Sequence, residues 1–173
     1  MGVPGITECK IGYTGPGGGL VFYNAEAAQS WGQYLEMAPK TWSGGNQDPT
    51  AIWCSKYKRS LRPGSFGTAI GKGDENTVRM DTGCTSGAGQ QAADYTAGGK
   101  SDWFLPSKDE LNAMYSYRNS IVDRAKYGFA SFTAYWSSSQ DGMFTAWTQG
   151  FSSGKAIPSG RRVSLFVRPV RAF

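Results

Sequence analysis

Apolar and polar positions along the chain predict strands near both ends and helices between them. Near the N-terminus, residues 20–24 and 33–39 are compact apolar runs typical of two strands, and Pro39 ends the second. A tip at residues 25–32 would join them into a hairpin, although its alanines also favour a helix there. Strand-like character returns late in the chain, and the strands predicted there span residues 134–139, 144–151 and 165–173.

The middle of the chain predicts short helices that follow a long loop. Residues 41–73 are punctuated by Gly, Pro and Ser, and only residues 51–55 there have the character of a short strand. Residues 74–83 predict a helix with Asp74 as its N-cap, and residues 88–99 predict another that ends in glycine. A loop as long as residues 41–73 within one domain is usually functional or cross-linked.

The clearest helix is predicted at residues 105–122. Ser107 stands at the N-cap position and Glu110 follows three residues later, which is the spacing of a capping box. One face of this helix carries Leu111, Met114, Tyr115, Arg118 and Ile121. Strands, then helices, then strands indicate an α+β domain with mixed or antiparallel sheets rather than alternating βαβ units.

Composition supports one domain of many short elements joined by tight turns. The chain has 173 residues with 24 glycines, 14% aromatic residues and only 18% charged residues. It contains no histidine, so the commonest general base and transition-metal ligand are missing. No segment is apolar over the length that a membrane-spanning helix needs. The first ten residues also lack a secretory signal, so we expect either another route or an excised domain that begins at Met1.

The three cysteines help to predict whether the protein is exported or stays in a reducing compartment. Cys54 and Cys84 are the plausible disulfide pair, closing a loop of about 30 residues, and Cys9 is left over. Sparse charge with abundant Gly, Trp and Ser favours an exported protein, in which disulfides persist. The alternative is three free thiols in a reducing compartment.

Basic residues are unevenly distributed along a chain of net charge +5. This pattern suits polyanionic partners such as sulfated glycans or nucleic acid, and the alternative is a positive surface that only water contacts. The first basic cluster is Lys56, Lys58, Arg59 and Arg62, and the second is Arg161, Arg162, Arg168 and Arg171.

Two small-residue motifs invite a catalytic interpretation that their surroundings do not favour. The serines at 137–139 have no histidine base, no Ser-x-x-Lys motif and no G-x-S-x-G turn, so we expect them to satisfy backbone and neighbouring polar groups. The GPGGG string at residues 15–19 lacks the phosphate-loop pattern and precedes a strand, so we expect a tight turn.

Acidic residues and cysteines give no stronger indication of an enzyme. No stretch has the spacing of a calcium loop, and three cysteines without histidine make a poor zinc site, so we expect neither a metal nor a cofactor. Asp102, Asp109 and Glu110 could form a carboxylate pair for hydrolysis, but helix capping and turn formation account for them. We therefore expect a protein that is not an enzyme.

Several phrases taken together resemble a bacterial family. They are GYTGPGGGLVFY, SDWFLPSKDELNAMY, YWSSS, AW followed by a phenylalanine, and the terminal VRPVRAF. In this order they resemble the C-terminal domain of collagen-like adhesins, over residues 12–173, with residues 1–11 as a lead-in. The resemblance implies a C-type-lectin-like fold with two main helices, a loop-rich region, and the strand at residues 20–24 paired with the C-terminal strand.

The resemblance also implies a function. Family members are non-enzymatic binding modules on cell-surface, adhesin or phage proteins, some of which bind sulfated glycans and some of which form trimers. The Glu-Pro-Asn, Gln-Pro-Asp and Trp-Asn-Asp signatures of calcium-dependent sugar binding are not in this chain. We therefore expect an extracellular or cell-surface module that binds a surface protein or a polyanionic glycan, with nucleic acid and membrane insertion not expected. The alternatives are a structural module such as a homotrimeric fibre tip and a glycan-processing enzyme.

The expected binding surface lies between the YWSSS and VRPVRAF motifs. In relatives diversified by retroelements, this window varies while the scaffold stays fixed, and here it spans residues 140–164. Trp136, Trp147, Phe151 and Gly154 match scaffold positions. The expected ligand-binding residues are Asp141, Met143, Phe144, Thr145, Thr148, Gln149, Ser152, Ser153, Lys155, Ile157, Ser159, Arg161 and Arg162.

Overall fold

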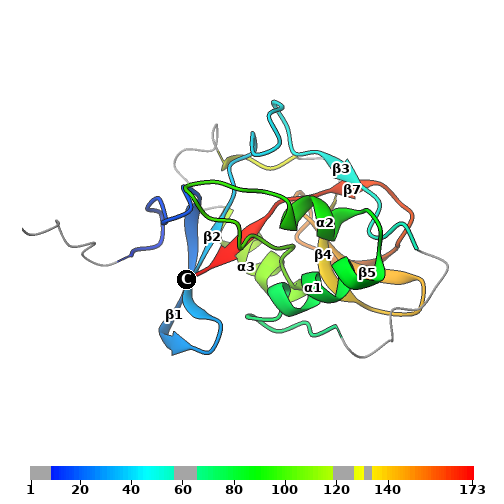
Figure 1. The fold of residues 1–173 in the computed structure, drawn as a ribbon, viewed down its shortest axis with the longest axis horizontal. Helices are drawn as coiled ribbons and strands as arrows, with labels where there is room; N and C mark the ends of the chain where they lie inside the picture. The colour runs from blue at the N-terminus through cyan, green and yellow to red at the C-terminus, as the bar shows by residue number, and fades with distance from the viewer. Residues whose placement is uncertain (1–8, 57–65, 119–126, 131–133) are drawn as a thin grey trace, which may run out of the picture.

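The described residues form two sheets and three helices, an α+β architecture as predicted (Figure 1). The structure, a computed structural model, describes residues 9–56, 66–118, 127–130 and 134–173. The C-terminal segment runs from one sheet to the other, because its strands β7 (Leu165–Phe166) and β8 (Val170–Ala172) belong to different sheets. The single strand predicted at residues 165–173 is thus divided at Pro169, which has no backbone N–H to donate to a ladder.

The smaller sheet joins the two ends of the chain. It contains β1 (Leu20–Gln29), β2 (Gly32–Met37) and β8 in the order β1-β2-β8, with antiparallel pairing throughout. The predicted hairpin is confirmed, and its tip is strand rather than helix. The partner of β8 is β2 and not the 20–24 run, because the fully buried β2 residues Leu35 and Met37 occupy the sheet's centre.

The larger sheet has five strands in the order β3-β7-β4-β5-β6. Ala134–Gln140 forms β4 and Thr145–Gly150 forms β5, close to the predicted bounds, whereas β3 is only Thr50–Ala51. Strand β6 (Ala156–Gly160) was not predicted, since its sequence AIPSG has the proline and glycine of a loop. Proline is tolerated on an edge strand, and β6 is at the edge.

The helices are α1 (Gly73–Gly83), α2 (Ala88–Ala93) and α3 (Lys108–Arg118). They follow the predicted order, although α2 ends earlier than predicted and α3 begins later. The capping box is confirmed: the Ser107 N–H donates to Glu110 Oε2 at 2.6 Å, and the Glu110 N–H donates to Ser107 Oγ at 3.3 Å. Asp74 is not an N-cap, because Lys72 holds that position in α1. Ile121 lies outside the described residues.

Strand β4 separates two hydrophobic cores. Successive side chains of a strand face opposite sides of its sheet. Tyr135 accordingly packs in the core that contains α3 and the smaller sheet, and Trp136 packs in the core that contains α1 and Trp53. The disulfide between Cys54 and Cys84 lies in this second core, with Cα atoms 5.4 Å apart, while Cys9 has no disulfide partner. In the chain-entropy model a closed loop of this size contributes about 3–4 kcal/mol.

A buried ion pair ties the long loop to the C-terminal segment. Arg168 donates from Nε to Asp48 Oδ1 at 2.7 Å and from Nη2 to Asp48 Oδ2 at 2.6 Å, and both side chains are almost fully buried. Arg168 also donates to the carbonyls of Ala38 and Gly128. Asp48 accepts a further bond from the hydroxyl of Tyr135. This pair thereby connects the loop after β2, the core strand β4 and the end of the chain.

The glycine string binds a carboxylate of the protein itself. The N–H groups of Gly17 and Gly19 each donate to the buried Glu36 carboxylate at 2.9 Å, and Arg171 donates to it at 3.0 Å. A Cβ on Gly19 would lie 2.6 Å from the Met37 carbonyl oxygen, so only glycine fits there. The predicted tight turn before a strand is confirmed, and the turn is closed by an internal ion pair.

The buried Glu110 makes the stability of the fold depend on pH. Burial raises the pKa of Glu110 from 4.5 to about 7, against the opposing effect of the N–H groups of Ser107, Gly71 and Gly73. Between these two values the folded protein keeps a proton that the unfolded chain has released. The free energy of unfolding should therefore fall by about 3 kcal/mol as pH rises from 4.5 to 7.

Urea unfolding at four pH values across this window tests the assignment. The chain has no histidine, so no imidazole titrates in the same range. Glu110→Gln removes the titrating group and should flatten the profile, whereas Asp109→Asn, an exposed change in the same turn, should leave it intact. An unchanged slope in Glu110→Gln would show that another group is responsible.

Candidate functional site

The window expected to bind a ligand, residues 140–164, forms one edge of the larger sheet. It includes β5, β6 and the loops on either side of them. Strand β6 pairs with β5 on one side, and no other strand among the described residues pairs with its opposite side. An edge of this kind is reachable by a partner.

Exposure divides the predicted site residues into three groups. Thr145 and Ser159 are half-buried, and Thr148, Gln149 and Arg161 are buried. The exposed residues are Asp141, Met143, Phe144, Ser152, Ser153, Lys155, Ile157 and Arg162. Only this last group is exposed to a ligand in solution.

The two buried uncharged residues hold the hairpin together. Thr148 Oγ1 donates to the carbonyl of Ile157 at 2.8 Å, which joins β5 to β6. Gln149 Nε2 donates to the carbonyl of Gly154 at 2.7 Å and so fixes the turn between these strands. The expectation that Thr148 and Gln149 contact a ligand is corrected, because both side chains are about 1% exposed.

Arg161 is part of the frame rather than an anion-binding side chain. It is 1% exposed, and it donates from Nη1 to the Met143 carbonyl at 3.0 Å and from Nη2 to the Lys56 carbonyl at 3.2 Å. Its guanidinium lies 4.8 Å from the centre of the Trp53 ring. Desolvation lowers the pKa of Arg161. The sequence could not show this burial, because the carbonyl of Lys56 is 105 residues away.

The second basic cluster is likewise mostly internal. Arg168 pairs with Asp48, and Arg171 bonds to both Glu36 and Asp102. Of the four arginines in that cluster, only Arg162 is exposed. In the first cluster Lys56 is exposed, while Lys58, Arg59 and Arg62 lie outside the described residues.

Four large apolar side chains are exposed in or beside the same window. Met143, Phe144, Ile157 and Val163 are 51%, 55%, 53% and 45% exposed. Together with Lys155 and Arg162, these side chains are called the hairpin surface from here on. Val163 was not among the predicted site residues. Its position in the window, directly after Arg161 and Arg162, is the feature of the sequence that could have suggested it.

Backbone contacts bring both ends of the window together at the hairpin surface. The Arg161 N–H donates to the Phe144 carbonyl at 3.0 Å, and the Val163 N–H donates to the Gly160 carbonyl at 2.9 Å. Cross-strand partners share a face of a sheet, so Ile157 continues the row of Thr148 and Trp136 outward from the core. The hairpin surface thus borders the packed core in which Trp136 and Trp53 lie.

The three serines of β4 are structural, as expected. All three are fully buried. Ser137 Oγ donates to the Trp147 carbonyl at 2.8 Å, Ser139 Oγ donates to the Gly67 carbonyl at 2.8 Å, and Ser138 Oγ accepts from Asn76 at 3.3 Å. These bonds hold β4 against β5 and the start of α1, and they leave no serine positioned as an exposed nucleophile.

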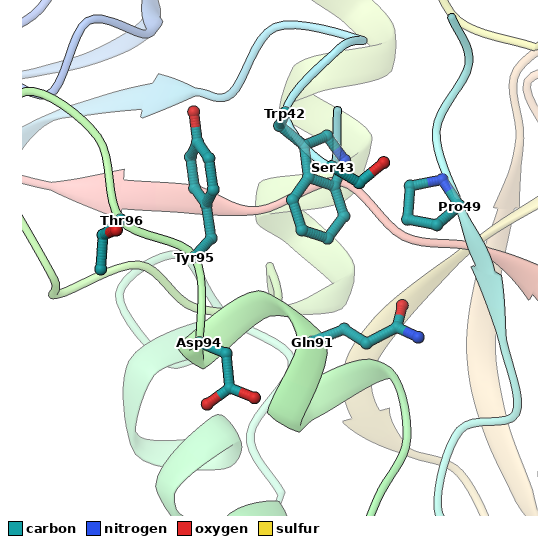
Figure 2. Close-up of a pocket in the computed structure, with 7 residues that line it drawn as sticks. All are labelled: Trp42, Ser43, Pro49, Gln91, Asp94, Tyr95 and Thr96. Carbon is teal, nitrogen blue, oxygen red and sulfur yellow. The ribbon is translucent and has the colours of Figure 1, made fainter. Parts of the chain in front are cut away.

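A separate pocket of about 500 Å³ opens between the long loop and α2 (Figure 2). The rings of Trp42 and Tyr95 stand beside each other there, with centroids 5.4 Å apart in an edge-to-face arrangement. The sequence did not predict this site, because its residues come from two loops and one short helix. The pocket is lined by Trp42, Ser43, Pro49, Gln91, Asp94, Tyr95 and Thr96.

Internal bonds fix the aromatic side of the pocket. Trp42 Nε1 donates to Asp48 Oδ1 at 3.1 Å and lies 3.2 Å from the Val167 carbonyl, which is also an acceptor. Tyr95 lies between Trp42 and Trp103, with its ring centre 4.9 Å from that of Trp103. The Asp48–Arg168 pair therefore also positions one wall of this pocket.

Neither a metal cluster nor a membrane-crossing helix is found within the described ranges. Among these residues, no group of three or more Cys, Asp or Glu side chains is arranged to hold a metal ion. None of the helices described is both long and apolar enough to cross a membrane.

Arg161 and Arg162 should behave oppositely when each is replaced by alanine. Arg161→Ala leaves two carbonyls and the Trp53 ring without their cation, and it should lower the free energy of unfolding by about 2 kcal/mol. Arg162→Ala, at an exposed position, should change the free energy of unfolding by less than about 0.5 kcal/mol. Urea unfolding measures both, and equal effects of the two substitutions would contradict the assignment of Arg161 to the frame.

Comparison with known proteins gives one family match. A model of the Lcl C-terminal domain matches residues 51–171, well over half of the chain. The match begins within β3, after the smaller sheet's hairpin, and it includes α1, α2, α3 and the whole hairpin surface. None of the curated proteins matches the chain.

Proposed function

Because the chain belongs to the Lcl C-terminal domain family, we propose that it is a non-enzymatic binding module that acts outside the cell. The hairpin surface is its binding face, and the ligand is a polyanionic glycan such as a sulfated polysaccharide. The internal bonding of Ser137, Ser138 and Ser139 supports a role without catalysis. The disulfide between Cys54 and Cys84 supports an oxidising environment outside the cytosol.

The observation that carries this proposal is the distribution of exposed cations along β6. Lys155 precedes the strand and Arg162 follows it, and both side chains are exposed. At the usual rise of a strand these positions are roughly 20 Å apart. Cations spaced along an exposed edge suit an extended chain with repeated negative charges better than a small ligand.

The charge balance of the protein favours the same ligand. Pairing of Arg168 with Asp48 and of Arg171 with Glu36 removes as many positive as negative charges from the surface. The net charge of +5 therefore belongs to the remaining groups. Lys56, whose carbonyl binds Arg161 beside Met143, adds an exposed cation next to the hairpin surface.

The exposed apolar side chains favour a second candidate function. Several large apolar side chains exposed in one segment of a protein can mark a protein interface. Met143, Phe144, Ile157 and Val163 could therefore pack against a protein ligand, or against other copies of the chain in an oligomer such as a trimer. Substitutions of these apolar side chains therefore separate binding to a protein or to another copy of the chain from binding to a glycan.

Heparin serves as the probe for the first function. Binding should be measured at several salt concentrations for the wild type and for Lys155→Ala/Arg162→Ala. The double variant should bind heparin at least fivefold more weakly than the wild type. Its affinity should also fall less steeply with salt, because two ionic contacts that salt screens have been removed. Lys100→Ala, which removes an exposed cation outside the window, is the control and should bind like the wild type.

The apolar variant Phe144→Ala/Ile157→Ala separates the alternatives. If heparin is the ligand, this variant should keep the salt dependence of the wild type. Should neither pair of substitutions affect heparin binding, the glycan function is wrong. A change in molar mass by light scattering on Phe144→Ala/Ile157→Ala would favour the oligomerisation function instead.

A further inference from the structure

We propose that the pocket between Trp42 and Gln91 is a second binding site, which takes an uncharged saccharide unit. It shares no residue with the hairpin surface, so the proposal does not depend on the function proposed above. A volume of about 500 Å³ lies within the range of pockets that hold small ligands.

Its aromatic side chains provide an apolar face of the kind on which sugar rings stack. Trp42 and Tyr95 are both half-buried, so part of each ring is open to the pocket. Trp42 is held by its indole N–H bond to Asp48, and Tyr95 is held between two tryptophans. Rings that are fixed before binding lose little conformational entropy when a ligand arrives.

Gln91 offers a hydrogen-bond acceptor that the protein leaves unused. Its Oε1 is buried, and no donor among the described residues reaches it. A buried acceptor without a partner is costly, and a rotation of the Gln91 side chain toward the pocket would let a ligand hydroxyl donate to it and remove that cost. Gln91 extends from α2 below the two rings (Figure 2), so a ring stacked on Trp42 can present a hydroxyl to its amide.

The charges around the pocket select against anionic ligands. None of the lining residues is a lysine or arginine, and Asp94 is an exposed carboxylate at the rim. The nearby Asp48 is already neutralised by Arg168. A sulfate or carboxylate group would therefore meet no cation here, whereas the hydroxyls of a neutral sugar would meet acceptors and hydroxyl groups of Ser43 and Thr96.

A cation is a weaker match for the same pocket. In Figure 2 the carboxylate of Asp94 points away from the ring of Trp42, so the acid and the aromatic face do not converge on one point. Trp42 and Tyr95 also meet edge to face, which does not enclose a cation between parallel rings. A quaternary ammonium ion is therefore included in the test as the competing ligand.

The test uses the methyl glycosides of glucose, galactose, mannose, fucose and N-acetylglucosamine as probes. Saturation-transfer NMR on the whole chain should detect at least one of them, and heparin should not displace it. Gln91→Met removes the amide at nearly constant size and should weaken that glycoside at least tenfold. Gln91→Glu keeps an acceptor at this position, so its affinity should stay within about threefold of the wild type. This loss is clearly smaller than the roughly tenfold loss expected when one hydrogen bond is removed.

Two further variants complete the design. Phe144→Ala changes the hairpin surface and should leave glycoside binding unchanged, and thermal melts of all variants check that they remain folded. The proposal is overturned if no glycoside gives a signal, if Gln91→Met binds as well as the wild type, or if tetramethylammonium displaces the glycoside or binds in its place.

Discussion

The rest of the structure depends on the buried ion pair between Asp48 and Arg168. Its two direct bonds lie where the long loop, strand β4 and the segment between β7 and β8 meet. Two buried charges are costly to desolvate, and only complete hydrogen bonding offsets that cost. Here the guanidinium also reaches two carbonyls, and the carboxylate also accepts from Tyr135 and Trp42. The pair therefore fixes the start of the long loop, where Trp42 forms part of the aromatic wall of the pocket.

The same principle recurs at two other arginines and explains which residues are left to bind ligands. Arg171 closes the glycine turn through Glu36, and Arg161 ties the end of β6 to the β4–β5 loop and to the long loop through the carbonyls of Met143 and Lys56. Three of the four C-terminal arginines thus act inside the protein. Within the window, the cations left for an outside partner are Lys155 and Arg162, which flank the edge strand β6 beside exposed apolar side chains, on a frame that binding need not reorganise.

Local signals made the helices and most strands predictable, whereas distant contacts decided the site. The two residues of the capping box, Ser107 and Glu110, are only three positions apart, so the local sequence alone was sufficient. The partners of Arg168 and Arg171 lie 120 and 135 residues away, and nothing near either arginine indicates burial. Strand β6 was missed because pairing with β5, rather than its own composition, makes AIPSG extended. The pocket was missed because Trp42 and Gln91 are brought together only by the fold.

A double-mutant cycle on Asp48 and Arg168 tests this account most directly. Urea unfolding of Asp48→Asn, Arg168→Met and the double variant gives the three free energies that the cycle needs. Each single change should cost about 3–5 kcal/mol because it leaves a buried charge without its partner. The double variant should cost clearly less than the sum of the two single changes, which is the mark of coupled residues. Small losses that simply add would contradict the claim that this pair organises the fold.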